Sequence, residues 1–416
     1  MTEYLAPLNY SRAREALHRL DAYTGYTPEG AAAALEVLRE CYPLVFSRAE
    51  QQTFERGAVL LELRGASVTD PLVFTARLDV PEGQHGEPGW QSEQMPLHVP
   101  LSRAHVVALL EALEELLRDG YCPGGDLILA LSMDGLSGGR GAQSMAAHLR
   151  ARGVTPCYVL DFGGYVTMDA FRNFLPKGAA LALVGIDEKT MQDVTLTARD
   201  RLGMCALFRL AAQLKQHPLR TGLCNASSRM LKKLGSHASG LYSLLLRNPG
   251  IAFPLLRLKW RNRSVMQQFF VSRQMVASVE ASGSRDEPAK EAVLRLRRLL
   301  VPGAAASLEG LERYCKRHGL AMTVENNYAH GTESDGAGEA LDALETAIEI
   351  QFEHTAIVPC LCPQVTDARF YDLPGGRVYR FSPFMVTGDE ALEGRCTITD
   401  GILQTAVQFF RSMLSV

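Results

Sequence analysis

The sequence predicts an α/β protein in which a mostly parallel, mixed sheet lies between helices and a second, smaller domain is inserted into the chain. Three patterns support this prediction. Buried-type strands alternate with amphipathic helices up to about residue 190, a βαββαβ order follows, and helix and strand alternate again after residue 338. Strands that alternate with helices form a parallel sheet covered on both faces. The first domain is therefore expected to be split in the sequence.

The first part of the chain, residues 1–190, begins with two helices between Tyr10 and Cys41, where leucine and alanine recur at helical spacing around a turn. Short apolar runs then predict strands, and amphipathic runs predict helices between them. The expected strands are residues 59–63, 72–76, 126–131 and 157–161, and the expected helices are residues 106–117 and 142–152. This order predicts a sheet whose central strands are buried on both faces.

The inserted domain is expected to span residues 191–330 and to contain a helical insertion at about 214–263. Its βαββαβ elements are strand 194–198, helix 206–215, strands 269–279 and 292–299, helix 308–318 and strand 320–324. A polar, glycine-rich segment then leads into the second part of the first domain, residues 331–416. This part is expected to hold helix 338–350, strand 356–361 and helix 401–414.

Composition excludes several classes of function. The chain has 416 residues with 43 Lys and Arg against 46 Asp and Glu, and it lacks long runs of one charge, so we expect no nucleic-acid partner. No apolar stretch is long enough for a transmembrane helix, and we expect no membrane partner. The N-terminal residues lack the pattern of a secretory signal, which predicts a cytoplasmic location. Nine cysteines at irregular spacing indicate free or buried thiols.

Six stretches of the sequence resemble, in order, motifs of the co-catalytic zinc peptidase family that includes carboxypeptidase S, Gly-Xaa carboxypeptidases and aminoacylases. They are residues 71–90, 132–142 (SMDGLSGGRGA), 159–164 (VLDFGG), 184–189 (VGIDEK), 365–373 (VTDARFYDL) and 378–383 (VYRFSP). The resemblance covers nearly the whole chain, and the inserted domain lies where the family carries its dimerising lid. It implies a zinc-peptidase-like fold, a homodimer formed through the lid, and hydrolysis of an N-acyl amino acid or a dipeptide with two zinc ions.

Three positions at which the family has metal ligands hold residues that cannot bind metal. Arg77 stands where the resemblance places a histidine, Leu101 where it places the bridging aspartate, and Gly135 where it places a glutamate. A guanidinium has no lone pair to offer and repels a cation, and an isobutyl group cannot be a ligand. Zinc binding is therefore expected to be lost, and we expect no cofactor.

Four other family positions hold a carboxylate in this chain. The resemblance implies that Asp79 orients a ligand, that Asp134 stands for the catalytic base with a side chain one methylene shorter, and that Asp161 is a metal ligand. Glu393 stands where the family has its last histidine ligand. We also expect Arg77 to form an ion pair with Asp161 in the place of a zinc ion, because the remaining carboxylates need a compensating positive charge.

Two arginines are candidates for binding the carboxylate of a ligand. Arg369 in the TDAR motif resembles a family arginine that pairs with substrate carboxylate, a task that suits its planar fork. Arg298 stands near a second such position, for which Arg297 is the alternative. Arg369 could instead serve the fold through an ion pair with Asp367 or Asp372.

Three functions remain open from the sequence. The first is a pseudoenzyme that has lost zinc binding and hydrolysis and keeps the binding of an N-acyl amino acid or peptide. The second is an active metal-dependent carboxypeptidase or aminoacylase-type hydrolase with a reduced or rearranged site, in which Asp161 and Glu393 hold one metal and Asp134 is the base. The third is an interaction protein that uses the apolar insertion between residues 218 and 263.

Overall fold

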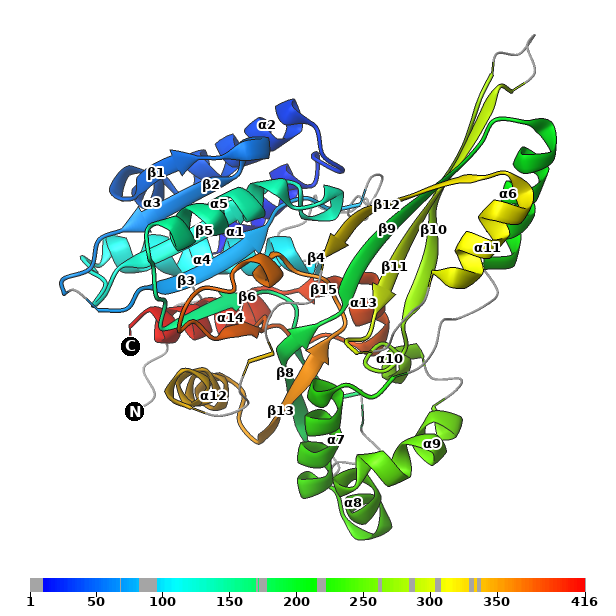
Figure 1. The fold of residues 1–416 in the computed structure, drawn as a ribbon. Coiled ribbons are helices and arrows are strands. Elements are labelled where there is room, and N and C mark those ends of the chain that lie inside the picture. The colour runs from blue at the N-terminus through cyan, green and yellow to red at the C-terminus, as the bar shows by residue number, and fades with distance from the viewer. Residues whose placement is uncertain are drawn as a thin grey trace.

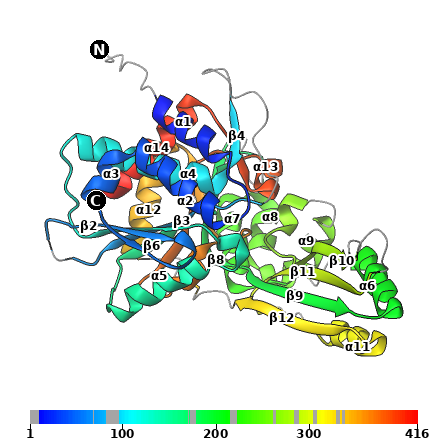
Figure 2. The ribbon, with the colours of Figure 1, turned by 90° about the horizontal axis from the view of Figure 1, so that it is seen from above.

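The computed structural model describes residues 10–67, 69–81, 96–169, 171, 178–214, 222–260, 264–283, 289–303, 308–328, 333–334 and 338–415. It consists of a large sheet flanked by helices and an elongated lid with a separate four-stranded sheet (Figure 1). Seen from above, the lid extends to one side of the helices that cover the large sheet (Figure 2). The predicted α/β fold with an inserted lid is confirmed.

The large sheet is mixed, and its central strands run parallel. Its order is β1-β2-β5-β3-β6-β14-β8-β13, with β7 paired to β8. The strands are β1 (Glu50–Thr53), β2 (Val59–Leu63), β3 (Leu72–Arg77), β5 (Leu127–Ser132), β6 (Tyr158–Asp161), β7 (Tyr165–Thr167), β8 (Ala180–Glu188), β13 (Thr355–Cys362) and β14 (Val378–Arg380). The neighbours β5, β3, β6 and β14 are parallel, whereas β1, β2 and β7 pair antiparallel.

Helices cover both faces of this sheet because alternate strand residues face opposite sides. In β5, Leu129 and Leu131 pack in one apolar cluster, and Ile128 and Ala130 pack in the other. The first cluster is covered by α1 (Ser11–Leu20), α2 (Pro28–Cys41), α4 (Leu101–Arg118), α12 (Glu339–Gln351) and α14 (Asp400–Leu414). The second is covered by α5 (Arg140–Ala151). Both faces are therefore buried, as the continuous apolar strands predicted.

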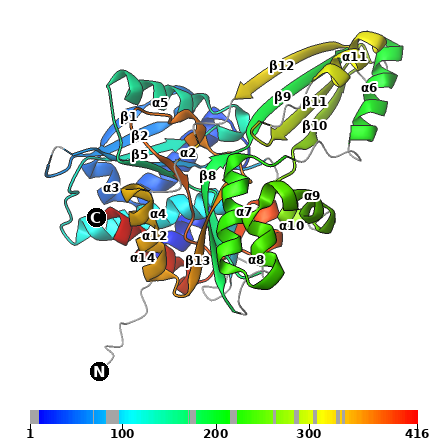
Figure 3. The same cartoon turned by 60° about the horizontal axis from the view of Figure 1, so that its bottom comes forward.

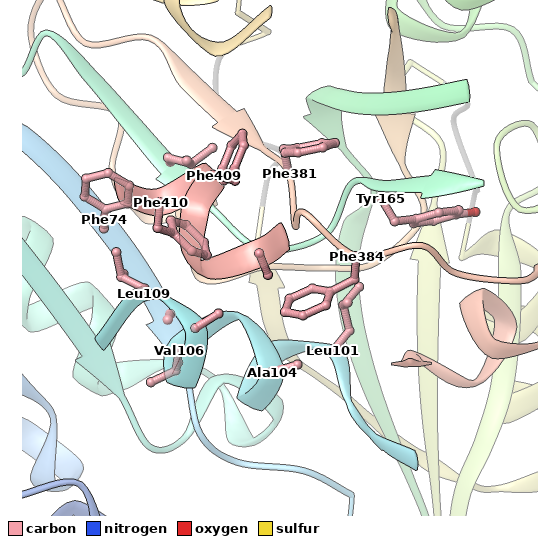
Figure 4. Close-up of a cluster of buried hydrophobic side chains, with 14 of the residues drawn as sticks. Phe74, Leu101, Ala104, Val106, Leu109, Tyr165, Phe381, Phe384, Phe409 and Phe410 are labelled. Atoms are coloured by element: carbon pink, nitrogen blue, oxygen red, sulfur yellow. The ribbon is translucent and has the colours of Figure 1, made fainter. Parts of the chain in front are cut away.

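The core beneath α4 and α14 is rich in aromatic side chains (Figure 4). Phe409 and Phe410 of α14 contact each other edge to face, and Phe410 also contacts Phe74 of β3. Leu101, the first residue of α4, is fully buried in this cluster. The helix therefore begins five residues earlier than its apolar periodicity predicted, and Leu101 belongs to the core.

The lid has the predicted βαββαβ order. Its strands β9 (Thr190–Ala198), β10 (Arg273–Ser282), β11 (Glu291–Leu300) and β12 (Ala321–Tyr328) form an antiparallel sheet in the order β10-β11-β9-β12. Helices α6 (Arg201–Leu214) and α11 (Glu309–His318) cover one face, against apolar side chains such as Leu196 and Leu294. β10 and β12 are the edge strands, the place at which the family pairs its lids according to the resemblance.

The helical insertion lies apart from the lid sheet. It contains α7 (Asn225–His237), α8 (Gly240–Arg247), α9 (Pro249–Lys259) and the short α10 (Ser264–Gln267). Helix α7 packs against β13, so the chain leaves the lid and returns to the large sheet (Figure 3). The insertion was predicted from the sequence, but its place beside β13 was not.

Several elements were not predicted. They include β8, the small two-stranded sheet of β4 (Leu97–Pro100) and β15 (Arg395–Ile398), and the short helix α13 (Gly388–Glu393). The pairing of β4 with β15 brings the start of α4 beside the end of α13, where the Leu101 N–H donates to the Gly394 carbonyl at 2.9 Å. Among the described residues, no helix combines the length and apolar character that a bilayer crossing requires.

Candidate functional site

A cavity of about 350 Å³ lies where the end of β3 meets the lid and α13. Its apolar lining includes Val80, Leu136, Met191, Leu299 and Val365. Its charged lining consists of four cationic side chains, Arg77, Lys189, Arg273 and Arg297, and two acidic ones, Asp79 and Glu393. Basic side chains therefore outnumber acidic ones in the lining of the cavity.

Arg77 is the last residue of β3 and is held at the cavity by two contacts. Its Nη1 donates to the Val365 carbonyl at 3.1 Å, and its guanidinium lies 5.0 Å from the centre of the Phe162 ring. Its Nε is buried without a hydrogen-bond partner among the described residues. Arg77 is therefore fixed by the loop before the TDAR motif and by an aromatic face.

Gly135 leaves the space that Arg77 needs. A Cβ atom at residue 135 would lie 2.7 Å from the Arg77 Cδ and 2.9 Å from Asp367 Oδ1, both closer than real Cβ contacts allow. A larger side chain such as glutamate would meet the same atoms. The arginine at position 77 and the glycine at position 135 are thus sterically complementary.

Asp79 lies buried at the edge of the cavity, two residues after β3. Its Oδ2 accepts a hydrogen bond from the Leu136 N–H at 2.7 Å. Burial raises the pKa of its carboxyl group, and the nearby charge of Arg77 lowers it. Asp79 therefore fixes the turn that contains Gly135.

Asp134 is committed to the start of α5. Its Oδ2 accepts from the Arg140 N–H at 2.9 Å, and its Oδ1 accepts from the Gly141 N–H at 3.1 Å. Burial raises the pKa of this carboxyl group to about 6. It is not among the residues that line the cavity, so the structure places the candidate base at a helix N-terminus, where backbone N–H groups need an acceptor.

Asp161 is fully buried at the end of β6 and also binds backbone. Its Oδ1 accepts from the Phe162 N–H at 2.7 Å, and its Oδ2 accepts from the Ala368 N–H at 2.8 Å. Burial, followed by the nearby charge of Asp367, raises its pKa to about 7. Arg77 forms no ion pair with Asp161 in the described structure. The expectation of that pair is corrected, because backbone donors occupy the Asp161 oxygens and Arg77 turns to Val365.

Glu393 and Asp161 lie in different environments. Glu393 is exposed at the end of α13 and lines the cavity, whereas Asp161 belongs to the buried floor. Leu101, which stands where the resemblance places the bridging aspartate, has a hydrocarbon side chain and lies in the core. Within the described part of the chain, no three His, Cys, Asp or Glu side chains converge to hold a metal. The residues present at the family positions do not fit a two-metal centre.

The candidate carboxylate-binding arginines lie away from the cavity lining. Arg369 is buried, with its guanidinium 4.5 Å from the centre of the Phe370 ring. Arg298 is buried in β11, and its Nη1 donates to Gln192 Oε1 at 2.6 Å. Arg297 faces the opposite side of the strand, as alternation requires, and lines the cavity.

Arg297 joins the lid to the turn at Gly135. Its Nε and Nη2 bind the two carboxylate oxygens of Asp193 at 2.8 and 2.9 Å, and Nη2 also donates to the Leu136 carbonyl at 2.8 Å. Of the two alternatives at this position, Arg297 is thus the one that reaches the cavity. Its guanidinium is largely occupied by protein groups.

Two cavity residues, Lys189 and Arg273, were not predicted from the sequence. The Lys189 Nζ is almost fully buried and donates to the Val271 carbonyl at 3.0 Å. Burial, with a contribution from the charge of Arg273, lowers the pKa of Lys189 to about 7. Arg273 opens β10, and burial lowers its pKa. The signal that could have found Lys189 is its place at the end of the VGIDEK motif.

A buried ion pair supports the floor of the site. Glu188 Oε2 accepts from Arg380 Nε at 3.0 Å, from the Thr366 N–H at 2.9 Å and from Thr366 Oγ1 at 2.8 Å. Both charged side chains are almost completely buried. This network joins three of the six motifs. They are the VGIDEK motif at the end of β8, the loop that contains TDAR, and the VYRFSP motif that begins with β14. The motifs therefore meet in space at Glu188, which directly precedes Lys189.

Comparisons with known proteins give distant but extensive matches. A scan against models of protein families finds no match. The chain is 22% identical over 388 residues to the human N-fatty-acyl-amino acid synthase/hydrolase PM20D1, covering 85% of this chain and 75% of that protein. It is 24% identical over 393 residues to the mouse protein of the same name, covering 84% and 74%.

Solved structures with the same architecture cover nearly the whole chain. An M20 family metallo-carboxypeptidase from Sulfolobus solfataricus aligns with a TM-score of 0.64 at 12% identity, covering 97% of this chain and 98% of that one. The dipeptidase Dug1p from Saccharomyces cerevisiae aligns with a TM-score of 0.62 at 9% identity, covering 97% and 95%. Human carnosine dipeptidase 1 aligns with a TM-score of 0.58 at 12% identity, with the same coverage. At such identities these likenesses establish the fold.

The complementarity of Arg77 and Gly135 predicts a coupled effect on stability. Gly135→Ala should lower the free energy of unfolding by about 1–3 kcal/mol, because the new methyl group overlaps Arg77 and Asp367. Adding Arg77→Ala should recover part of this loss, since it removes the nearer atom. Urea unfolding of the single and double variants measures the coupling. Gly310→Ala is the control, because nothing lies within 4 Å of a Cβ there. Equal losses for Gly135→Ala in both backgrounds would contradict the prediction.

The raised pKa of Asp161 predicts that stability falls as pH rises. The folded state holds a proton up to about pH 7, whereas the unfolded carboxyl loses it near its ordinary value of 3.8. Between these values the folded state binds more protons, so the free energy of unfolding decreases with pH, by about 4 kcal/mol for a shift of this size. Asp161→Asn should flatten the pH dependence of urea unfolding between pH 4 and 7. The exposed Asp372→Asn is the control, and an unchanged slope in Asp161→Asn would refute this role.

Proposed function

The chain belongs to the M20 metallopeptidase family, and from this premise we propose that it binds the carboxylate of an N-acyl amino acid or peptide without two-metal hydrolysis. The observation that carries the proposal is the position of Arg77. It stands where the resemblance places a histidine ligand, and its side chain occupies space that a side chain at residue 135 would need. A guanidinium at this place supplies a fixed positive charge and no lone pair.

Positive charge on the protein suits a carboxylate ligand. A two-metal centre would place cations among acidic ligands, whereas this cavity has four cationic side chains against two carboxylates. The Arg273 side chain forms no hydrogen bond or ion pair with another described residue, and Lys189 lies close enough for their charges to interact. A carboxylate placed between them would relieve this repulsion. We therefore assign Arg273 and Lys189 as the groups that hold the ligand's anionic end.

The apolar lining suits the other end of such a ligand. The names of the curated relatives describe N-fatty-acyl-amino acids, which combine an acyl chain, an amide and a carboxylate. Met191, Met275, Leu299 and Leu392 contribute apolar surface beside the cations. Methionine side chains adapt to ligands of varied shape. The ligand class of the relatives is thus compatible with the cavity.

The hydrolase alternative requires the carboxylates of Asp161 and Asp134, whose oxygens already accept hydrogen bonds from backbone N–H groups. Asp161 would have to release two backbone N–H groups to bind metal, and Asp134 would have to leave the start of α5 to act as a base. A buried N–H left without an acceptor costs about 1–3 kcal/mol. These costs favour the binding function over hydrolysis.

Carboxylate recognition predicts a difference between two matched ligands. N-decanoyl-phenylalanine should bind at least about tenfold more tightly than its primary carboxamide, because only the carboxylate can pair with Arg273 and Lys189. Arg273→Met should weaken binding of the carboxylate by at least about tenfold and leave binding of the carboxamide unchanged. Isothermal titration calorimetry measures both affinities.

Arg295→Met provides the control for this experiment. Arg295 lies on β11 but pairs with the exposed Glu280 and is not part of the cavity lining. Its loss should leave both affinities unchanged. Equal affinity for the two ligands in the wild-type protein would rule out carboxylate recognition.

Loss of the metal centre predicts that the purified protein lacks stoichiometric metal. Protein prepared without chelators should contain well under one zinc per chain by elemental analysis. It should show no hydrolysis of N-decanoyl-phenylalanine with added zinc, cobalt or manganese. Stoichiometric metal together with turnover that Asp134→Ala abolishes would instead establish the hydrolase alternative.

A further inference from the structure

The helical insertion lies at one end of the molecule (Figure 1), and it carries an exposed apolar face. Five aliphatic side chains of α8 and α9 are each 63–84% exposed, namely Leu241, Leu244, Ile251, Leu255 and Leu258. We call these residues the α8–α9 apolar face. Their spacings of three within α8, and of four and three within α9, place them on one side of each helix.

The exposed side chains of α8 and α9 belong to helices whose other sides are packed against the protein. The opposite sides of α8 and α9 are buried through Leu246, Ala252 and Leu256, and Trp260 at the end of α9 stacks on Phe270. The two helices are also joined to each other, since the Lys259 Nζ donates to the Tyr242 hydroxyl at 2.5 Å and lies 4.4 Å from the centre of its ring. The insertion thus has an inner apolar side that packs and an outer apolar side that faces solvent.

The charged residues that the insertion itself contributes are all basic. Between Asp200 and Glu280 the sequence contains no aspartate or glutamate, although the chain as a whole has a formal charge of −3. The exposed Lys and Arg residues of α7, α8 and α9 are Arg229, Lys232, Lys233, Arg247, Arg257 and Lys259, and of these Arg229 pairs with Glu333 from outside the insertion. The net charge of the molecule therefore conceals a basic insertion that carries the exposed apolar face.

Aliphatic side chains bordered by Lys and Arg are typical of helices that lie in the interface of a bilayer. The apolar side chains enter the boundary between headgroups and acyl chains, and the basic side chains bind anionic headgroups. Soluble monomers rarely expose apolar patches of this kind without a partner. An insertion whose own Asp and Glu content is zero complements a negative surface more specifically than it complements an ordinary protein surface, which carries both signs.

We propose that the α8–α9 apolar face docks on the surface of a membrane that contains anionic lipids. Docking is peripheral, because neither helix is long enough to cross a bilayer. The proposal departs from the sequence-based expectation of no membrane partner, which rested on the lack of a transmembrane segment. The expected cytoplasmic location would place this face beside the leaflet that carries anionic lipids.

Vesicle sedimentation of the full chain tests this proposal. The protein should sediment with vesicles of phosphatidylcholine that contain about 30 mol% phosphatidylserine, and at least about tenfold less with vesicles of phosphatidylcholine alone. Raising the salt concentration to about 0.5 M should weaken the binding, since it screens the basic residues. Equal binding to both kinds of vesicle, or binding to neither, would overturn the proposal.

A matched pair of variants assigns the binding to this face. Leu244→Glu/Ile251→Glu should reduce binding to the anionic vesicles at least about tenfold. Leu202→Glu/Ile350→Glu is the control, with the same change in charge at two exposed positions outside the insertion, and it should keep most of the binding. Equal losses in the two variants would overturn the assignment, and circular dichroism verifies that both remain folded.

Self-association through the same face is the competing outcome. Sedimentation velocity without vesicles should give the same molecular mass for the wild-type protein and for Leu244→Glu/Ile251→Glu. An oligomer that dissociates only in this variant, combined with no binding to vesicles, would overturn the proposal and identify a second copy of the chain as the partner.

Discussion

The steric complementarity of Arg77 and Gly135 is the constraint on which the rest of the site depends. Arg77 can lie across the end of β3 only because residue 135 has no side chain, and a side chain at 135 would displace the arginine. With the arginine in place, the carboxylate of Asp79 has a nearby positive charge and the cavity becomes cationic. One pair of residues thus couples the packing of the site to the sign of its charge.

The carboxylates that the resemblance associates with metal have structural tasks in this chain. Asp79 accepts a backbone hydrogen bond from the Gly135 turn, Asp134 holds the first turn of α5, and Asp161 binds the backbone at Phe162 and Ala368. Each oxygen that accepts an N–H relieves a buried donor, which stabilises the local backbone. These hydrogen bonds give the three aspartates a structural role that does not depend on a metal ion.

The cavity and the helical insertion are close along the chain. Gln268 follows α10 directly and lines the cavity, and Arg273 begins β10 four residues after Phe269. A ligand with an apolar chain partitions into membranes, so a protein that docks on a bilayer would meet it at high local concentration. The two proposals therefore fit one another, although each rests on its own residues and is tested separately.

The sequence by itself determined the fold and the chemical identity of the residues at the positions that the resemblance associates with metal. Strands 59–63 and 126–131 carry apolar residues on both faces, and the βαββαβ order defines the lid, so local patterns sufficed. The expectation that Arg77, Leu101 and Gly135 cannot bind metal could be made directly, because the ability to bind metal depends on the chemical identity of a side chain.

Only the tertiary structure decided where the side chains point and which of them meet. It brought Lys189 and Arg273, which are far apart in sequence, to one cavity, and it directed Arg297 to the cavity in place of Arg298. It also showed that the oxygens of Asp161 accept hydrogen bonds from backbone N–H groups and form no ion pair with Arg77. Contacts between distant segments and the choice among rotamers depend on packing across the whole chain, which local sequence patterns do not contain.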